Sequence, residues 1–88
     1  MITHIKTAIK SVIIDAQIYL FGDDGEHFEA IVISAEFEGK PLVKQHQLVM
    51  NALKTELGSN QVHALALKTF TPEKWDVAKD KFNLELAK

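Results

Sequence analysis

The spacing of the apolar residues changes abruptly near residue 15. Over residues 3–14 the apolar side chains recur at the i, i+3, i+4, i+7 and i+8 positions of one helix face. From residue 16 onward β-branched and aromatic residues dominate, which is typical of strands. Because two strand-like runs follow at once, we expect the apolar stripe of the helix to pack on a sheet. Thr3 has the side chain of an N-cap, and the stripe consists of Ile5, Ala8, Ile9, Val12 and Ile13.

The two strand-like runs cover residues 16–21 and 27–37 and predict a β-hairpin. The Gly-Asp-Asp-Gly segment between them, residues 22–25, favours a tight turn because glycine and aspartate tolerate positive φ. The same segment matches the G-x-x-G loop of KH-type RNA-binding domains. Its two carboxylates would repel phosphate, however, so a turn is the better interpretation.

A helix, or a broken pair of helices, is predicted after the hairpin. Residues 38–41 end the second strand and place Pro41 at the first helical position, where its missing N–H costs nothing. Gly58 follows as a C-terminal cap. The apolar face of this segment is marked by Leu42, Val49, Met50, Leu53 and Leu57.

A third strand and a last helix complete the predicted elements. The strand covers residues 62–70 and is apolar on both sides, so we expect much of it to be buried. Thr71 and Pro72 then provide an N-cap and a first helical residue. Trp75 continues that helix at core spacing, and we expect the tail after Phe82 to fray.

The predicted element order is therefore αββααβα, in one small α+β domain spanning residues 1–88. The helical segment between the second and third strands is long enough for a crossover connection. A right-handed crossover places the third strand parallel to the second. We therefore predict a three-stranded mixed sheet with helices packed against it.

The composition excludes several classes of function. All ten basic side chains are lysine, so the arginine fork that commonly contacts guanine and phosphate is missing, and the net charge is −2. The absence of cysteine excludes disulfides, a nucleophilic thiol and any thiolate-ligated metal site built by this chain alone. With no signal-peptide pattern and no apolar stretch of ~20 residues, we expect a soluble cytoplasmic protein that does not enter membranes.

The four histidines are the side chains best suited to metal binding or proton transfer. His46 shares the apolar face of its helix, which favours a structural role. For His63, at the start of the third strand, the pattern alone also favours a structural role. His27 and His63 would meet if the second and third strands are parallel neighbours. Two ligands would leave a metal half-coordinated, so a partner would have to supply the rest.

Enzyme signatures are missing from the sequence. It contains no G-x-S-x-G motif, no glycine-rich loop between a strand and a helix, and no carboxylate pair in apolar surroundings. Phe70 and Trp75 could stack on nucleic-acid bases, but their spacing is more typical of a core. We therefore expect a protein that is not an enzyme.

Three segments resemble the BolA-like protein family. Residues 37–49 are similar to the family's central signature, residues 62–75 to its C-terminal signature, and the Gly-Glu-His-Phe segment at residues 25–28 to the start of its second strand. The short hairpin loop is more similar to the IbaG branch than to BolA itself. This resemblance implies a fold similar to class II KH domains, in agreement with the predicted element order.

The resemblance also implies a partnership with a monothiol glutaredoxin in iron–sulfur trafficking. In such complexes a 2Fe–2S cluster is shared by a glutaredoxin cysteine, glutathione and ligands from the BolA-like chain. The family's C-terminal histidine ligand falls on His63, which we therefore expect to bind the cluster and, with Lys68, to contact the partner. The family's loop ligand has no counterpart in residues 22–26, so His27 is the nearest second candidate. No cofactor is expected on the chain alone, which we expect to be a monomer or weak homodimer.

A second role implied by the family is transcriptional regulation through duplex DNA, in the stress response or cell morphology. The Arg-His-Arg that the family often carries is Gln45-His46-Gln47 here, so the flanking charges are absent. A nucleic-acid surface would have to use lysines. A metal-free protein-interaction module is a third alternative. The candidate nucleic-acid lysines are Lys40, Lys44, Lys68 and Lys74, and a larger basic cluster would add Lys79 and Lys81.

Overall fold

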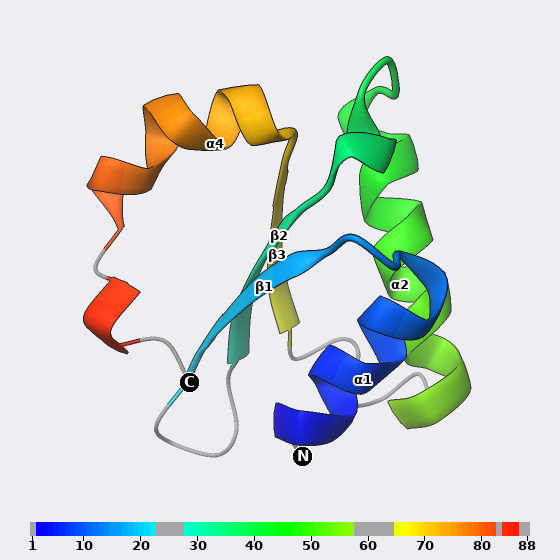
Figure 1. Ribbon diagram of the computed structural model, residues 1–88. Helices are drawn as coiled ribbons and strands as arrows, with labels where there is room; N and C mark the ends of the chain where they lie inside the picture. Colours follow the sequence, from blue (N-terminus) through cyan, green and yellow to red (C-terminus); the bar gives the residue numbers. More distant parts are fainter. Residues whose placement is uncertain (1, 23–27, 58–64, 83, 87–88) are drawn as a thin grey trace.

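The computed structural model describes residues 2–22, 28–57, 65–82 and 84–86, and it confirms the predicted α+β class (Figure 1). Residues 58–64, which include the expected helix cap Gly58 and the expected first residues of the third strand, lie outside the described residues. The helices are α1 (Ile2–Val12), α2 (Leu42–Leu57) and α4 (Pro72–Ala78), the strands are β1 (Gln17–Phe21), β2 (Phe28–Ile33) and β3 (Leu65–Phe70), and the 3₁₀ turns are η1 (Ala35–Phe37), η2 (Lys79–Lys81) and η3 (Leu84–Leu86).

The strands form a mixed sheet in the order β1-β2-β3, as predicted. β1 and β2 are antiparallel, with Gln17 opposite Ile33. β2 and β3 are parallel, and their first residues, Phe28 and Leu65, pair with each other. The chain therefore enters β2 and β3 at the same end of the sheet.

The sheet separates two apolar clusters, with α1 and α2 on one face and α4 on the other (Figure 1). Alternate side chains of the central strand supply both clusters because successive residues of a strand point to opposite faces. Ala30 and Val32 pack with α1 and α2, whereas Ile31 and Ile33 pack with Trp75 of α4. All five of these residues are buried. β2 is thus the central layer of the core.

The second strand is shorter than predicted. It ends at Ile33, and Ala35–Phe37 forms the turn η1 instead of continuing the strand. Ser34 caps this turn, because its hydroxyl accepts a hydrogen bond from the Glu36 N–H at 3.0 Å. The turn buries the Phe37 ring completely in the core beside α2. The aromatic residue that looked typical of a strand is therefore a core residue of a turn.

Two predicted helix starts are corrected. α1 begins at Ile2, so Thr3 lies inside the helix and is not its N-cap, which requires non-helical backbone angles. Pro41 precedes α2 and does not open it. The Pro41 carbonyl accepts the backbone N–H of Lys44 and of Gln45, at 2.9 and 3.1 Å, which is the position of a cap.

The buried face of α2 is rotated from the predicted one. Leu42 is 62% exposed, while Gln45 and Ala52 are buried beside Val49 and Leu53. The Thr69 hydroxyl of β3 donates a hydrogen bond to the Gln45 side-chain oxygen at 2.7 Å. This contact fixes which face of α2 is buried. Val12, predicted on the buried stripe of α1, is also 49% exposed.

The start of α4 is as predicted. The Thr71 side chain accepts the N–H of Lys74, Pro72 occupies the first helical turn, and Trp75 is buried. The chain after Phe82, where we expected fraying, includes the turn η3, and Leu84 packs against the cluster around Trp75.

Candidate functional site

The two predicted cluster ligands, His27 and His63, lie outside the described residues. Their neighbours along the chain are described. His27 immediately precedes Phe28, the first residue of β2, and His63 stands two residues before Leu65, the first residue of β3. Phe28 and Leu65 are register partners in the parallel pair. The segments that carry the two histidines therefore lead into one end of the sheet.

Lys68, predicted to contact a partner or nucleic acid, points to the face of the sheet that carries α4. Its ammonium lies 3.3 Å from the Glu29 carboxylate on β2 and 5.1 Å from the centre of the Phe82 ring. The side chain is 51% exposed. An exposed ion pair of this kind stabilises a fold only weakly, so the ammonium can exchange Glu29 for another anion.

The other three candidate lysines lie at the opposite end of the sheet from the two histidine-bearing segments. Lys40 and Lys74 line an open hollow of about 480 Å³ together with Glu38 and Glu73. The Lys40 ammonium donates a hydrogen bond to the Glu36 carbonyl at 2.6 Å. Lys44 is exposed on the first turn of α2. The four lysines thus do not form one continuous basic surface, because Lys68 is paired elsewhere and two carboxylates share the hollow.

His46 is half-buried on α2, and Trp75 is buried on α4. The imidazole borders a small, largely apolar hollow of about 270 Å³ where α2 passes the edge of β3. Trp75 stacks at tilted angles against Tyr19, Phe70 and Phe82, with ring centres 5.4–5.6 Å apart. This contact with three other rings is a packing role, as expected for Trp75.

Asp15 and Ser34 form a polar contact that the sequence analysis did not identify. The Ser34 hydroxyl donates to Asp15 Oδ1 at 2.5 Å, and the Ala35 N–H donates to Asp15 Oδ2 at 3.0 Å. The hydrogen bond from Ser34 is the main reason that the pKa of Asp15 is lowered from 3.8; burial opposes this effect, and the Ala35 N–H adds to it. Nineteen residues separate Asp15 from Ser34, so no local pattern indicates the pair.

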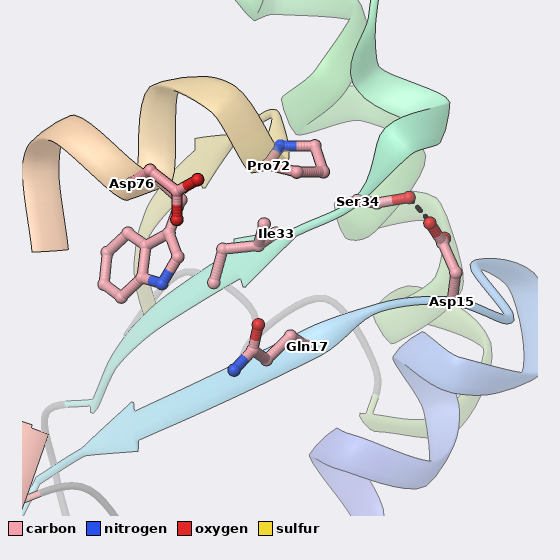
Figure 2. Close-up of a pocket in the computed structure, with 7 residues that line it drawn as sticks. Asp15, Gln17, Ile33, Ser34, Pro72 and Asp76 are labelled. Carbon is pink, nitrogen blue, oxygen red and sulfur yellow. Dashed lines mark hydrogen bonds between the residues drawn. The ribbon is translucent and has the colours of Figure 1, made fainter.

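The Asp15–Ser34 contact forms one end of a hollow of about 170 Å³, and Asp76 of α4 lies at the other end (Figure 2). Gln17 and Ile33 form its floor on neighbouring strands. The Asp15 carboxylate already accepts two hydrogen bonds, and the Ser34 hydroxyl is used as well. This hollow therefore contains no free nucleophile–base pair of the kind that catalysis requires.

Within the described part of the chain, no group of three or more His, Cys, Asp or Glu side chains is arranged to hold a metal ion. None of the described helices is long and apolar enough to cross a membrane.

The comparisons with known proteins agree on one family. The model for BolA-like proteins matches residues 4–74. BolA-like protein 2 of Mus musculus is 50% identical over 48 residues, which are 54% of each chain, so the match spans about half of that relative. The acid stress protein IbaG of Escherichia coli K12 is 34% identical over 71 residues, 76% of this chain and 83% of IbaG.

A transcriptional regulator and a solved structure extend the comparison. The DNA-binding transcriptional regulator BolA of Haemophilus influenzae is 43% identical over 49 residues, 56% of this chain and 47% of the regulator. The structure of a BolA protein homologue from Coxiella burnetii superposes with a TM-score of 0.68 at 39% identity. The superposition covers 82% of this chain and 91% of the homologue.

Proposed function

Because this chain belongs to the BolA-like protein family, we propose that it is a non-enzymatic adaptor that pairs with a monothiol glutaredoxin. In this complex it shares or transfers a 2Fe–2S cluster, as part of iron–sulfur trafficking and iron homeostasis. His63 is the proposed cluster ligand on this chain, and His27 is the proposed second ligand. The cluster is cargo that is held in the complex and not by the chain alone.

The donor chemistry supports this division of ligands. Iron–sulfur clusters are held mainly by thiolates, and this chain has no cysteine. Glutaredoxin and glutathione would supply the thiolates. Imidazole nitrogen is the one remaining side-chain donor of this chain that replaces thiolate at known cluster sites.

The observation that carries the proposal is the parallel register of β2 and β3. Because Phe28 and Leu65 pair, the segments that contain His27 and His63 both lead into the same sheet end. A histidine in each segment suits a cluster placed between this end and a partner. Lys68, on β3 and 51% exposed, is the proposed contact for a partner carboxylate.

The proposal is tested by anaerobic reconstitution with a monothiol glutaredoxin, iron, sulfide and glutathione. We expect the visible absorption and circular dichroism of the glutaredoxin cluster to change as this protein is added, and to saturate at a fixed ratio. His63→Ala should abolish or alter that change while leaving the far-ultraviolet spectrum intact. His46→Ala is the matched control, because His46 is half-buried on α2 and is not a proposed ligand.

Two outcomes would contradict the cluster proposal. An unchanged spectrum together with no co-migration on a sizing column would exclude the complex. Co-migration without a spectral change would leave an adaptor that binds glutaredoxin without contributing a ligand, and His63 would then be structural.

Binding to duplex DNA is the second candidate function, and one relative named a DNA-binding transcriptional regulator favours it. Lys40 and Lys74 border one hollow beside the exposed Lys44. This alternative predicts binding that weakens steeply with salt, survives His63→Ala and weakens in Lys44→Ala. Lys54→Ala, an exposed lysine near the other end of α2, is the control that should bind normally.

A further inference from the structure

A hollow of about 170 Å³ lies where β2 and β3 end, between α4 and the segment that follows α1 (Figure 2). The two candidate ligand histidines precede the first residues of β2 and β3, so this hollow lies at the other end of the sheet. None of the four candidate nucleic-acid lysines borders it. The hollow is therefore separate from the proposed cluster position and from the hollow that Lys40 and Lys74 line.

Two carboxylates occupy the two ends of this hollow. Asp15 accepts the Ser34 hydroxyl on Oδ1 and the Ala35 N–H on Oδ2, so its carboxylate is held in one orientation. Each of its oxygens keeps a second lone-pair position for another donor. Asp76 lies 3.8 Å from the Lys79 ammonium and its side chain is 76% exposed. So weak an ion pair leaves the Asp76 carboxylate available to a stronger donor.

The Gln17 side chain adds a third acceptor on the floor of the hollow. Its amide nitrogen donates to the Tyr19 hydroxyl at 2.7 Å, and Figure 2 shows its amide oxygen pointing toward Ile33 and the hollow. None of the described residues that line the hollow is basic. Acceptors on three sides, two of them charged, favour a cation that donates several hydrogen bonds.

The arrangement suits a guanidinium better than a metal ion or an ammonium. In the part of the chain that the structure describes, no three His, Cys, Asp or Glu side chains are placed to hold a metal ion. An ammonium is a compact charge whose acceptors must surround one point, whereas a guanidinium presents five N–H donors in a flat fork. The faces of such a fork pack on aromatic and apolar walls, which Trp75 and Pro72 supply here.

The surroundings favour a protein side chain over a free cation. Asp15, Gln17 and Asp76 are exposed, so the hollow would enclose too little of a small free molecule. Ile14 directly precedes Asp15 and is 85% exposed. Val77 directly follows Asp76 and is 80% exposed. These are the two most exposed large apolar side chains that the structure describes, and apolar side chains beside a polar recess are typical of protein interfaces.

We propose that this hollow is a docking site for an arginine side chain of a partner protein. The guanidinium donates to the carboxylates of Asp15 and Asp76 and to the amide oxygen of Gln17. Apolar residues of the partner that flank the arginine contact the exposed aliphatic side chains at the two ends of the hollow. The site is independent of the proposed glutaredoxin complex, because it lies at the opposite end of the sheet, and its test uses the chain alone.

NMR titration of the ¹⁵N-labelled chain with the peptide acetyl-Val-Arg-Val-amide tests the site. We expect the largest shifts at the Gln17 side-chain amide and the Trp75 indole N–H, and we expect binding to weaken as salt is added. The same peptide with citrulline in place of arginine keeps the shape of the side chain without its charge, and it should cause no such shifts. A lysine peptide should bind several-fold more weakly, because it lacks the fork.

Charge variants provide the second measurement. Asp76→Asn should raise the dissociation constant of the arginine peptide about two- to fivefold, as expected for an exposed ion pair, and Gln17→Glu should lower it by adding a carboxylate. Glu73→Gln is the matched control, because it makes the same charge change on α4 but borders the other hollow, and it should bind normally.

Four results would overturn the proposal. They are shifts that avoid this hollow, equal binding of the citrulline peptide, unchanged binding in Asp76→Asn, and binding of the guanidinium ion alone as tightly as the peptide. The last result would make the hollow a site for small free cations. None of these results depends on whether the chain binds glutaredoxin.

Discussion

At the scale of single residues, Asp15 shows how a surface carboxylate can hold two distant segments together. It follows α1 along the chain and accepts hydrogen bonds from Ser34 and Ala35, which follow β2. Ser34 is buried, and its hydroxyl also caps the turn η1. One carboxylate thus joins the segment between α1 and β1 to the segment that follows β2.

Asp15 gives a pH-dependent prediction. Its pKa in the folded protein lies below 3.8, chiefly because the Ser34 hydroxyl donates to it. The ionised Asp15 carboxylate therefore contributes its full share to the stability of the fold above about pH 3.8. This contribution is lost as the pH falls through the lower pKa of the folded state. Asp15→Ala should reduce the free energy of unfolding by at most about 1 kcal/mol at neutral pH, because solvent screens this exposed carboxylate, and by less in strong acid.

Chemical denaturation of both proteins at several pH values measures this difference. Asp76→Ala is the matched control, because Asp76 borders the same hollow and its exposed ion pair with Lys79 should contribute less than about 0.5 kcal/mol. A loss from Asp15→Ala that stays constant down to strong acid would refute the role of the ionised carboxylate.

Gly39 gives a prediction based on backbone conformation alone. Its φ of +77° lies in the left-handed region, and no heavy atom would lie within 4 Å of an added Cβ. Gly39→Ala should therefore destabilise the protein by about 1–2 kcal/mol through strain without a steric clash. Gly39→Asn should lose less, because asparagine tolerates this region. Equal stability of Gly39→Ala and the parent in urea denaturation would show that the turn relaxes freely.

The roles of single residues could be predicted from the sequence only where the interacting residues lie close together in the chain. Thr71 and Pro72 are adjacent, and their N-cap and first-turn roles are observed as predicted. Asp15 and Ser34 are far apart in the chain, so no spacing rule indicates them. The roles predicted for His27 and His63 concern residues outside the described part and stay predictions.

At the scale of elements, the contact between α2 and β3 depends on a buried polar side chain. Gln45 is 5% exposed; its amide nitrogen donates to the carbonyls of Lys40 and Phe37, at 2.8 and 3.4 Å, and its oxygen accepts from Thr69 at 2.7 Å. The amide thus joins the turn before α2, the helix itself and β3. Each of these buried polar groups would be costly if left without a partner.

A double-mutant cycle tests this contact. Gln45→Ala should lower the free energy of unfolding by about 2 kcal/mol, because it leaves the Thr69 hydroxyl and a backbone carbonyl without partners. Thr69→Val should cost about 1 kcal/mol, and the double variant should lose about 1 kcal/mol less than the sum. Strictly additive losses in chemical denaturation would mean that the two side chains do not stabilise each other.

The contact between Gln45 and Thr69 explains why the buried face of α2 differs from the face that the apolar spacing predicts. Apolar spacing selected Leu42 and could not select Gln45, because a glutamine is normally assigned to the solvent side. The position of Gln45 four residues before Val49 does place it on the observed buried face. Similarly, residues 35–37 look strand-like, but the long-range Asp15–Ser34 contact turns the chain there.

At the scale of the whole molecule, the α+β class and the sheet arrangement follow from the sequence, whereas of the two helices predicted between the second and third strands the described residues contain one, α2. The helix stripe, the hairpin and the crossover predict a mixed sheet, and β2 is indeed antiparallel to β1 and parallel to β3. This arrangement makes β2 the central strand, leaves β3 at an edge and brings the beginnings of β2 and β3 together. The proposed cluster position lies at this end of the sheet.

The central claim is that an imidazole of this chain binds iron in a cluster shared with glutaredoxin. The most direct measurement is pulsed electron paramagnetic resonance of the reduced complex, with ¹⁵N-histidine in this chain and unlabelled glutaredoxin. We predict a strongly coupled ¹⁵N signal that persists in His46→Ala, and that in His63→Ala is lost or falls to the contribution of the second proposed ligand, His27. A reduced 2Fe–2S complex without coupling to ¹⁵N would contradict the account, because every ligand would then come from glutaredoxin and glutathione.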